Sequence, residues 1–202
     1  MSSVCFIARL RIIMDALLTS TVVVALAEIG DKTQLLAILL AARFRKPLPI
    51  ILGILAATLG NHFLAALLGA SMASIFEAAW FHYLVAAGFL AMAIWTLIPD
   101  KLDELEEKPA RLGAFMTTAI AFFLVEMGDK TQIATVALGA QFQQVAMVTI
   151  GTTLGMLIAN VPAVFLGHEL LRRVPLGLVR MIAAGLFAVI GLWLLIEGPG
   201  RF

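Results

Sequence analysis

The sequence predicts an all-α integral membrane protein with six transmembrane helices arranged as two inverted three-helix repeats. Three observations support this prediction. The 202 residues are 62% hydrophobic and 13% charged, with a mean hydropathy of +1.03, whereas soluble domains are typically about 45–50% apolar and about 25% charged. A transmembrane helix needs roughly 20 apolar residues, so six helices with short loops account for the whole length. Finally, the seven-residue motif at 28–34 returns at 126–132 with a single change, Ile29 to Met127.

The apolar segments follow one another in two matching sets of three. The first repeat occupies 1–99, with Met1 and Met14 as alternative starts, and the second occupies 112–202. Between them lies a strongly polar, acidic linker at 100–111, which we expect in the cytoplasm. The predicted spans are 14–42, 49–76, 81–98, 112–140, 145–171 and 176–196.

The repeat extends beyond the motif. A shift of 98 residues places Gly53 on Gly151, and it also pairs Phe89 with Phe187. Because each unit has three spans, the second unit must enter the membrane from the opposite side, which makes the repeat inverted.

The distribution of basic residues predicts the orientation. The loops after the first, third and fifth spans hold Lys and Arg, whereas the loops after the second and fourth hold neither. By the positive-inside rule, the first set of loops is cytoplasmic and both termini lie outside. These basic residues are Arg43, Arg45, Lys46, Lys101, Lys108, Arg111, Arg172 and Arg173.

Both motifs place charged residues deep inside predicted spans, where ionisable groups are costly and usually functional. On a continuous helix Glu28, Asp31 and Lys32 would share one face, and the second motif repeats this arrangement. Gly30 and Gly128 would allow either close approach of another helix or local unwinding of the backbone.

Two such sets facing each other form an oxygen-rich site, which suits hard divalent cations such as Mn²⁺, Ca²⁺ or Mg²⁺. Cys5 is the single cysteine and neither motif contains histidine, so copper and the usual zinc sites are disfavoured. Clustered carboxylates without a cation should take up protons, so cation and proton could exchange. The candidate ligands are Glu28, Asp31, Glu126 and Asp129. The supporting residues are Lys32, Thr33, Gln34, Lys130, Thr131 and Gln132.

Some roles stay open at this point. Lys32 and Lys130 could pair with Glu28 and Glu126 at i,i+4 spacing, or hold the acids in place from outside the coordination shell. Both motifs could also form buried salt bridges that fix helix register, although polar contacts that only hold helices together do not require identical residues in both halves.

Three polar residues of the second and fifth spans are weaker candidates for the site. Asn61 and Asn160 are 99 residues apart, one more than the repeat shift, and are interpreted as loosely equivalent. His62 is given no counterpart, and a hydrogen-bonded structural role is favoured for it.

The doubled Glu-x-Gly-Asp-Lys-Thr motif resembles that of a family of membrane cation transporters. This family includes bacterial manganese exporters and the Golgi and chloroplast manganese/calcium transporters of eukaryotes. The resemblance covers the whole chain and implies a transporter, not an enzyme, that exports Mn²⁺, or else Ca²⁺, from the cytoplasm in exchange for protons. It implies no resident cofactor, and the short loops are similar to those of a prokaryotic inner (plasma) membrane member.

The expected partners are a divalent ion, protons and the lipid bilayer, with no nucleic acid. Two alternatives are an exporter of amino acids or other small solutes, and a membrane-embedded enzyme or structural subunit. The sequence does not decide between Mn²⁺ and Ca²⁺, and it leaves the proton stoichiometry and the oligomeric state open.

Overall fold

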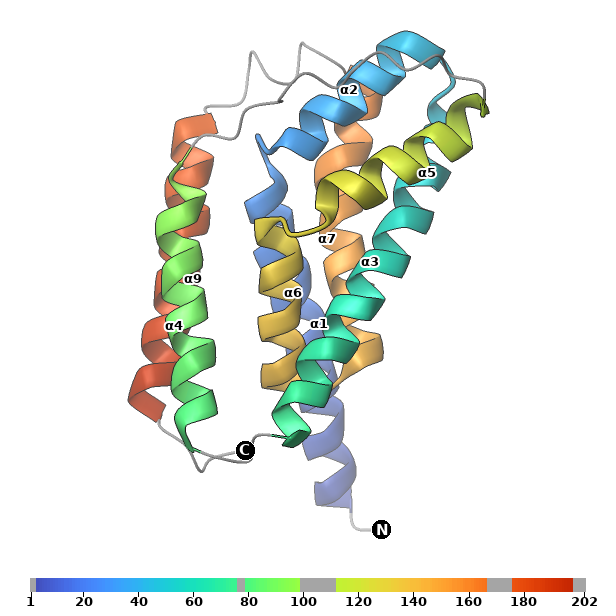
Figure 1. Cartoon of the computed structure of the whole chain (residues 1–202). Helices are drawn as coiled ribbons and strands as arrows, with labels where there is room; N and C mark the ends of the chain where they lie inside the picture. Colours follow the sequence, from blue (N-terminus) through green and yellow to red (C-terminus); the bar gives the residue numbers. More distant parts are fainter. Residues whose placement is uncertain (1–2, 76–78, 99–111, 167–175, 198–202) are drawn as a thin grey trace.

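The computed structural model describes residues 3–75, 79–98, 112–166 and 176–197 (Figure 1). Within these residues the chain forms eight α-helices joined by short connections, which confirms the predicted all-α class. The helices are α1 (Ser3–Glu28), α2 (Lys32–Phe44), α3 (Pro47–Ile75), α4 (Ala79–Thr96), α5 (Gly113–Glu126), α6 (Lys130–Phe142), α7 (Val145–Leu166) and α9 (Leu176–Glu197).

The two motifs interrupt the helices that carry them. We predicted continuous spans over 14–42 and 112–140, but each is divided into two helices, α1 with α2 and α5 with α6. The physical reason lies in the motif glycines, since Gly30 has a φ of 82° and Gly128 a φ of 77°. Only glycine adopts this left-handed conformation without a steric penalty. Of the two roles predicted for these glycines, the structure shows local unwinding.

The break changes which motif residues share a face. Asp31 and Asp129 occupy the N-cap positions of α2 and α6 in an extended backbone conformation, while Glu28 ends α1 and Glu126 ends α5. The predicted single stripe of acids and lysine along one helix is therefore wrong. Each motif instead places one carboxylate at the end of a helix and another at the start of the next.

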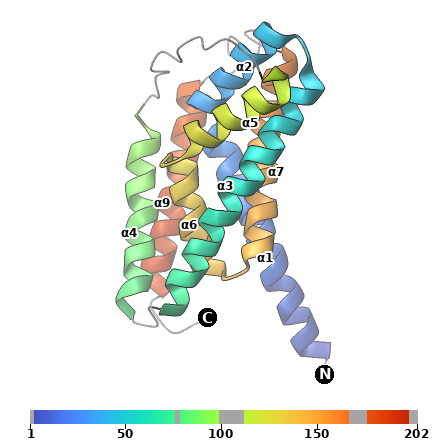
Figure 2. The ribbon, with the colours of Figure 1, turned by 45° about the vertical axis from the view of Figure 1, so that its right-hand side comes forward.

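The helices of the two halves run in opposite directions. In Figure 1, α1 and α2 rise from the bottom of the view to the top and α3 returns, whereas α5 and α6 descend and α7 rises. The helix α1 packs along α7, and α3 packs along α5, α6 and α7. The helices α4 and α9 pack against each other on one side of the molecule (Figures 1 and 2).

Glycines bring the central helices into close contact. A Cβ atom added at Gly53 on α3 would lie 2.8 Å from the carbonyl oxygen of Phe115 on α5. One added at Gly151 on α7 would lie 2.6 Å from the carbonyl oxygen of Leu17 on α1. Such small residues allow helix backbones to approach closely, which is how membrane helices commonly pack.

Two clusters of buried apolar residues form the core of the described residues. One is built around the rings of Phe89 on α4 and Phe187 on α9, whose centroids are 6.2 Å apart. The other gathers Ile50, Phe122 and Met156 from α3, α5 and α7. The charged motifs thus lie in the interior of the bundle, where buried charges need partners.

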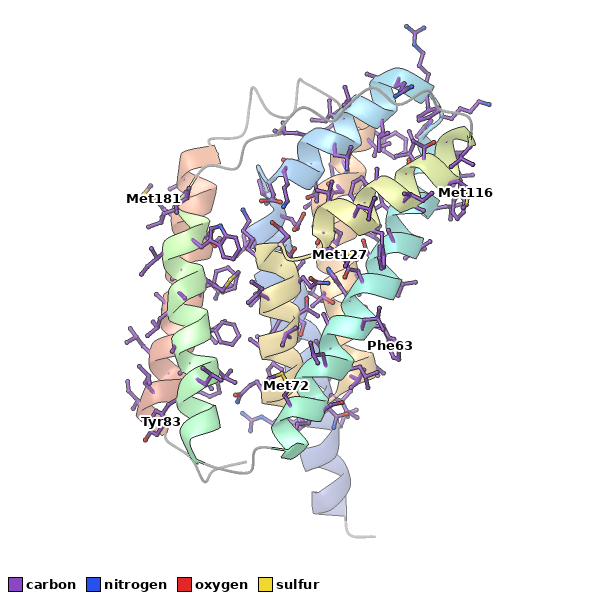
Figure 3. The ribbon with its side chains drawn as sticks, viewed as in Figure 1. Phe63, Met72, Tyr83, Met116, Met127 and Met181 are labelled. Atoms are coloured by element: carbon purple, nitrogen blue, oxygen red, sulfur yellow. The ribbon has the colours of Figure 1, made fainter. Side chains whose placement is uncertain are left out.

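Among the residues that the structure describes, three helical segments are long and apolar enough to cross a membrane, namely Leu10–Glu28, Pro47–Met72 and Val145–Leu166. Shorter apolar helices cover Tyr83–Thr96, Gly113–Glu126 and Met181–Ile196. The large side chains Phe63, Met116 and Met181 project outward from α3, α5 and α9 (Figure 3), as expected of lipid-facing residues. The predicted linker at 100–111 lies outside the described residues.

Candidate cation site

The centre of the site is a cluster of three carboxylates from the two motifs. One oxygen each of Glu28, Glu126 and Asp129 can be chosen so that all three lie within 4.8 Å of one another. Both glutamates are 0% exposed. The fourth predicted ligand, Asp31, is also buried but is not part of this cluster. The structure therefore brings three of the four predicted ligands together directly.

A threonine of the same motif binds each glutamate. The Thr131 hydroxyl donates to Glu126 Oε2 at 2.9 Å, and the Thr33 hydroxyl donates to Glu28 Oε2. These bonds are possible because the chain unwinds between the glutamate and the threonine, so that the first turn of the following helix faces back toward the acid. Each threonine fixes one carboxylate oxygen.

The aspartates and lysines form ion pairs that cross between the motifs. Lys32 Nζ lies 2.7 Å from Asp129 Oδ1, and Lys130 Nζ pairs with Asp31 Oδ1. One predicted role paired each lysine with the glutamate four residues before it, and the helix break removes this i,i+4 relation. Each lysine instead joins the aspartate of the other motif, and the alternative in which the lysines hold the acids in place is closer to the observed arrangement.

The motif glutamines stabilise the unwound segments. Gln34 Oε1 accepts a hydrogen bond from the backbone N–H of Gly30 at 2.9 Å, and Gln132 Oε1 accepts one from Gly128 at 2.6 Å. The side-chain amide nitrogens also contact the other half of the chain. Gln34 Nε2 donates a hydrogen bond to the carbonyl oxygen of Ala159 at 3.0 Å. They support the shape of the site from outside the carboxylate cluster.

Gln132 makes the corresponding contact on the opposite side of the site. Its Nε2 donates to Asn61 Oδ1, while Asn61 Nδ2 donates to the carbonyl oxygen of Phe123 at 3.4 Å. Asn61 therefore occupies the place that Ala159 occupies in the other half, as the shift of 98 residues requires.

The structure corrects the predicted pairing of the weaker candidates. Asn160 Nδ2 lies 3.5 Å from Glu28 Oε2, and His62 Nε2 lies 3.8 Å from Glu126 Oε2. His62 and Asn160 are thus the equivalent residues, and the interpretation that His62 has no counterpart is wrong. The signal was present in the sequence, because 62 and 160 differ by the repeat shift of 98.

The charges of the site match those of a divalent cation. Two ammonium groups face four carboxylates, so two negative charges are left uncompensated if every acid is ionised. Buried charge of this kind is costly without a counter-ion. Several buried polar atoms also lack a hydrogen-bond partner among the described residues and could coordinate an ion, namely Glu28 Oε1, Glu126 Oε1, Asn160 Oδ1 and both ring nitrogens of His62.

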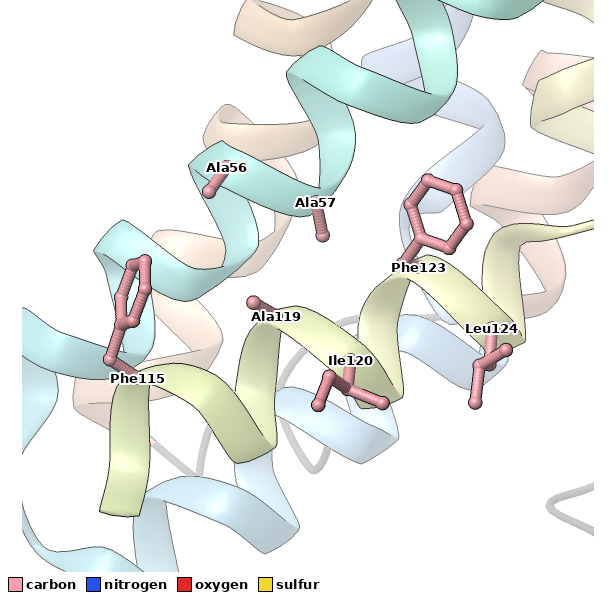
Figure 4. A pocket seen from close by; sticks show the side chains of 7 residues that line it. All are labelled: Ala56, Ala57, Phe115, Ala119, Ile120, Phe123 and Leu124. Carbon is pink, nitrogen blue, oxygen red and sulfur yellow. The ribbon is translucent and has the colours of Figure 1, made fainter. Parts of the chain in front are cut away.

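A separate groove of about 370 Å³ lies between α3 and α5 (Figure 4). Its lining residues are Ala56, Ala57, Phe115, Ala119, Ile120, Phe123 and Leu124. All seven side chains are apolar, so none of them can bind a cation, and none of these residues belongs to the carboxylate cluster.

The chain matches the family described as divalent cation/proton antiporter GDT1 over residues 16–104 and 114–201. A protein described as a candidate manganese exporter in Vibrio cholerae is 52% identical over 181 residues, covering 89% of this chain and 90% of that protein. GDT1-like protein 5 of Arabidopsis thaliana is 25% identical over 205 residues, covering 83% and 89%. A GDT1-like protein of Synechocystis is 26% identical over 204 residues, covering 89% and 98%. No solved structure matches the chain.

These matches confirm the resemblance inferred from the doubled motif. The family is one of transporters, so the enzyme alternative is set aside, and its description names a divalent cation rather than an amino acid. The matched residues include both motifs and the helical segments on either side of each motif. The chain is an integral membrane protein that belongs to the divalent cation/proton antiporter family GDT1.

Proposed function

We propose that this protein exports Mn²⁺ from the cytoplasm in exchange for protons, with Glu28, Glu126 and Asp129 as the ligands that both halves share. Asp31, held by Lys130, completes the set. The observation that carries this proposal is the convergence of three buried carboxylates, from two motifs 98 residues apart, to within 4.8 Å. Buried acids in a membrane protein mark ion pathways, and a divalent ion would balance their charge.

The proposed architecture is a pair of inverted repeats related by a pseudo-twofold axis. A twofold axis makes every contact between residues i and j recur between their equivalents. The ion pair Lys32–Asp129 recurs as Lys130–Asp31 in this way. The close approach of Gly53 to Phe115 likewise recurs between Gly151 and Leu17. Together with the opposite course of the helices in Figure 1, these contacts support the inverted repeat.

Broken helices suit this role. The site lies where α1 ends and α2 begins, and where α5 ends and α6 begins, and transporters commonly bind ions at such discontinuous helices. Rocking of one half against the other would expose the shared carboxylates to each side in turn. We place the protein in a prokaryotic plasma membrane with both termini outside, on the strength of its bacterial relative and the basic loops.

The choice of Mn²⁺ rests on the relative from Vibrio cholerae, which is described as a candidate manganese exporter. Carboxylate and amide oxygens suit Mn²⁺, Ca²⁺ and Mg²⁺ alike. Ca²⁺ is therefore the second candidate substrate, and the transport experiment includes it.

Transport into inside-out membrane vesicles tests the proposal. With an acidic vesicle interior, the wild-type protein should accumulate Mn²⁺, because protons leaving the vesicle drive the ion inward. Asp129→Asn and Asp31→Asn should each lower the initial rate by more than about tenfold, since groups that orient metal ligands typically contribute about 10–100-fold. The rates of ⁵⁴Mn²⁺ and ⁴⁵Ca²⁺ uptake give the result directly.

Asp15→Asn is the matched control, because Asp15 is an exposed aspartate of α1 whose contact is a 4.0 Å ion pair with Arg11. This variant should transport at the wild-type rate. Uptake that is independent of the proton gradient, or equal in all three variants, would contradict the proposal.

A further inference from the structure

His62 is a buried histidine that faces the carboxylate cluster. It lies on α3 and is 0% exposed, whereas the next residue, Phe63, is 47% exposed and points away from the bundle (Figure 3). The imidazole Nε2 is 3.8 Å from Glu126 Oε2. Neither ring nitrogen has a hydrogen-bond partner among the described residues. Since buried polar atoms are almost always satisfied, the structural role favoured from the sequence does not explain this side chain.

The equivalent residue of the other half is an asparagine. Asn160 Nδ2 binds the carbonyl oxygen of Met156 at 3.1 Å and approaches Glu28 Oε2 at 3.5 Å. The two halves of the site are therefore alike in their acids, threonines, lysines and glutamines, but one half has His62 at the position where the other has Asn160. This difference places an imidazole nitrogen beside the carboxylates on one side of the site only.

The distances allow His62 and Glu126 to bind one ion. Ligand atoms lie about 2.0–2.6 Å from a divalent cation, so two ligands of the same ion can be up to about 5 Å apart. The separation of 3.8 Å between Nε2 and Oε2 is within this range. Glu126 also belongs to the cluster with Glu28 and Asp129, so an ion held there is within reach of the imidazole.

We propose that His62 is a nitrogen ligand of the transported cation and selects a first-row transition ion such as Mn²⁺ over Ca²⁺ and Mg²⁺. This inference rests on the proposed function of the carboxylate cluster. Ca²⁺ and Mg²⁺ take oxygen ligands, whereas first-row transition ions also bind nitrogen ligands, with an affinity that rises from Mn²⁺ to Cu²⁺. Replacing one oxygen ligand by nitrogen therefore favours the transition ion, and position 62 would set a preference that the acids alone do not provide.

Electron spin echo spectroscopy of bound Mn²⁺ tests the coordination without changing His62. The chain has three histidines, at positions 62, 82 and 168. The full-length variant His82→Asn/His168→Asn, purified without a histidine tag and labelled with ¹⁵N-histidine, retains His62 alone. We expect bound Mn²⁺ to show ¹⁵N coupling in this variant and ¹⁴N coupling in its unlabelled form. Bound Mn²⁺ with no histidine coupling would overturn the inference.

Competition binding tests the selectivity. His62→Asn gives this position the same side chain as its counterpart at 160. It should lower the affinity for Mn²⁺ relative to Ca²⁺ by at least about tenfold, since mutating a residue that only supports a metal ligand already lowers the affinity by about 10–100-fold. His62→Gln, which keeps a polar side chain, serves as a second variant if the first folds poorly.

The outcomes separate this inference from the proposed function. If the variants at position 62 bind both ions with the wild-type ratio, His62 is not a ligand, while the carboxylate site stands. If the wild-type protein itself binds no Mn²⁺, the proposed function fails and the inference fails with it.

Discussion

Glu28→Gln and Glu126→Gln are each expected to weaken Mn²⁺ binding by more than about 100-fold. Both carboxylates are fully buried members of the cluster. Mutating residues that only hydrogen-bond to a metal ligand already lowers the affinity for the metal by about 10–100-fold. Each substitution keeps the shape of the side chain but removes a charge that the cation requires. Titration of free Mn²⁺ by electron paramagnetic resonance against the purified protein measures the loss.

Thr33→Val and Thr131→Val are the matched controls for the two glutamates. Each removes the hydroxyl that donates to a glutamate but leaves every charge in place. We expect these variants to bind Mn²⁺ about tenfold more weakly, in the range typical of groups that orient a ligand. Binding by Glu28→Gln that equals binding by Thr33→Val would show that this carboxylate does not contact the ion.

Lys130→Met and Lys32→Met are both expected to destabilise the protein strongly. The aspartates that these substitutions leave without a partner, Asp31 and Asp129, have side chains that are 0% and 3% exposed. Removing one partner of a buried ion pair typically costs about 3–5 kcal/mol, because the other charge is left buried and uncompensated. Thermal unfolding in detergent, followed by tryptophan fluorescence, measures both variants.

The double variant Lys130→Met/Asp31→Asn distinguishes charge pairing from packing. Replacing both partners of a buried pair with neutral groups is often close to neutral for stability. We therefore expect this variant to recover most of the stability that Lys130→Met alone loses. If the double variant is as unstable as the single one, the lysine stabilises the fold by its packing and not by its pairing with Asp31.

The convergence of the two motifs could be predicted from the sequence because repetition at a fixed shift carries the information. A shift of 98 residues matched the acids, and inversion followed from the odd number of spans. The structure adds crossed contacts such as those of Lys32 with Asp129 and of Lys130 with Asp31. Those partners were not predicted, because on a continuous helix each lysine finds its nearest acids within its own motif.

The helix break itself was one of two outcomes compatible with the motif glycines. Glycine permits both close helix packing and left-handed backbone, and the sequence alone does not choose between them. Gly53 and Gly151 serve the first purpose, whereas Gly30 and Gly128 serve the second. The difference depends on tertiary contacts, including the hydrogen bonds of Gln34 and Gln132 to the unwound segments.

The equivalence of His62 and Asn160 depends on their positions in the repeat and not on their residue types. The position of His62 differs from that of Asn160 by the repeat shift, yet matching residues by type paired Asn160 with Asn61 instead. Equivalent positions of a repeat can carry different side chains, and the contacts with Glu126 and Glu28 reveal the correct pairing. Position within the repeat was therefore a better guide than residue identity.

Coupled movement of Mn²⁺ and protons in proteoliposomes tests the central claim most directly. The vesicles would contain a pH-sensitive dye and equal potassium on both sides with valinomycin, which removes any membrane potential. With a Mn²⁺ gradient directed inward and no initial pH difference, exchange predicts that the interior becomes alkaline as Mn²⁺ enters. The pH change should disappear in Glu28→Gln/Glu126→Gln. Mn²⁺ entry without a change of interior pH would contradict proton exchange at this site.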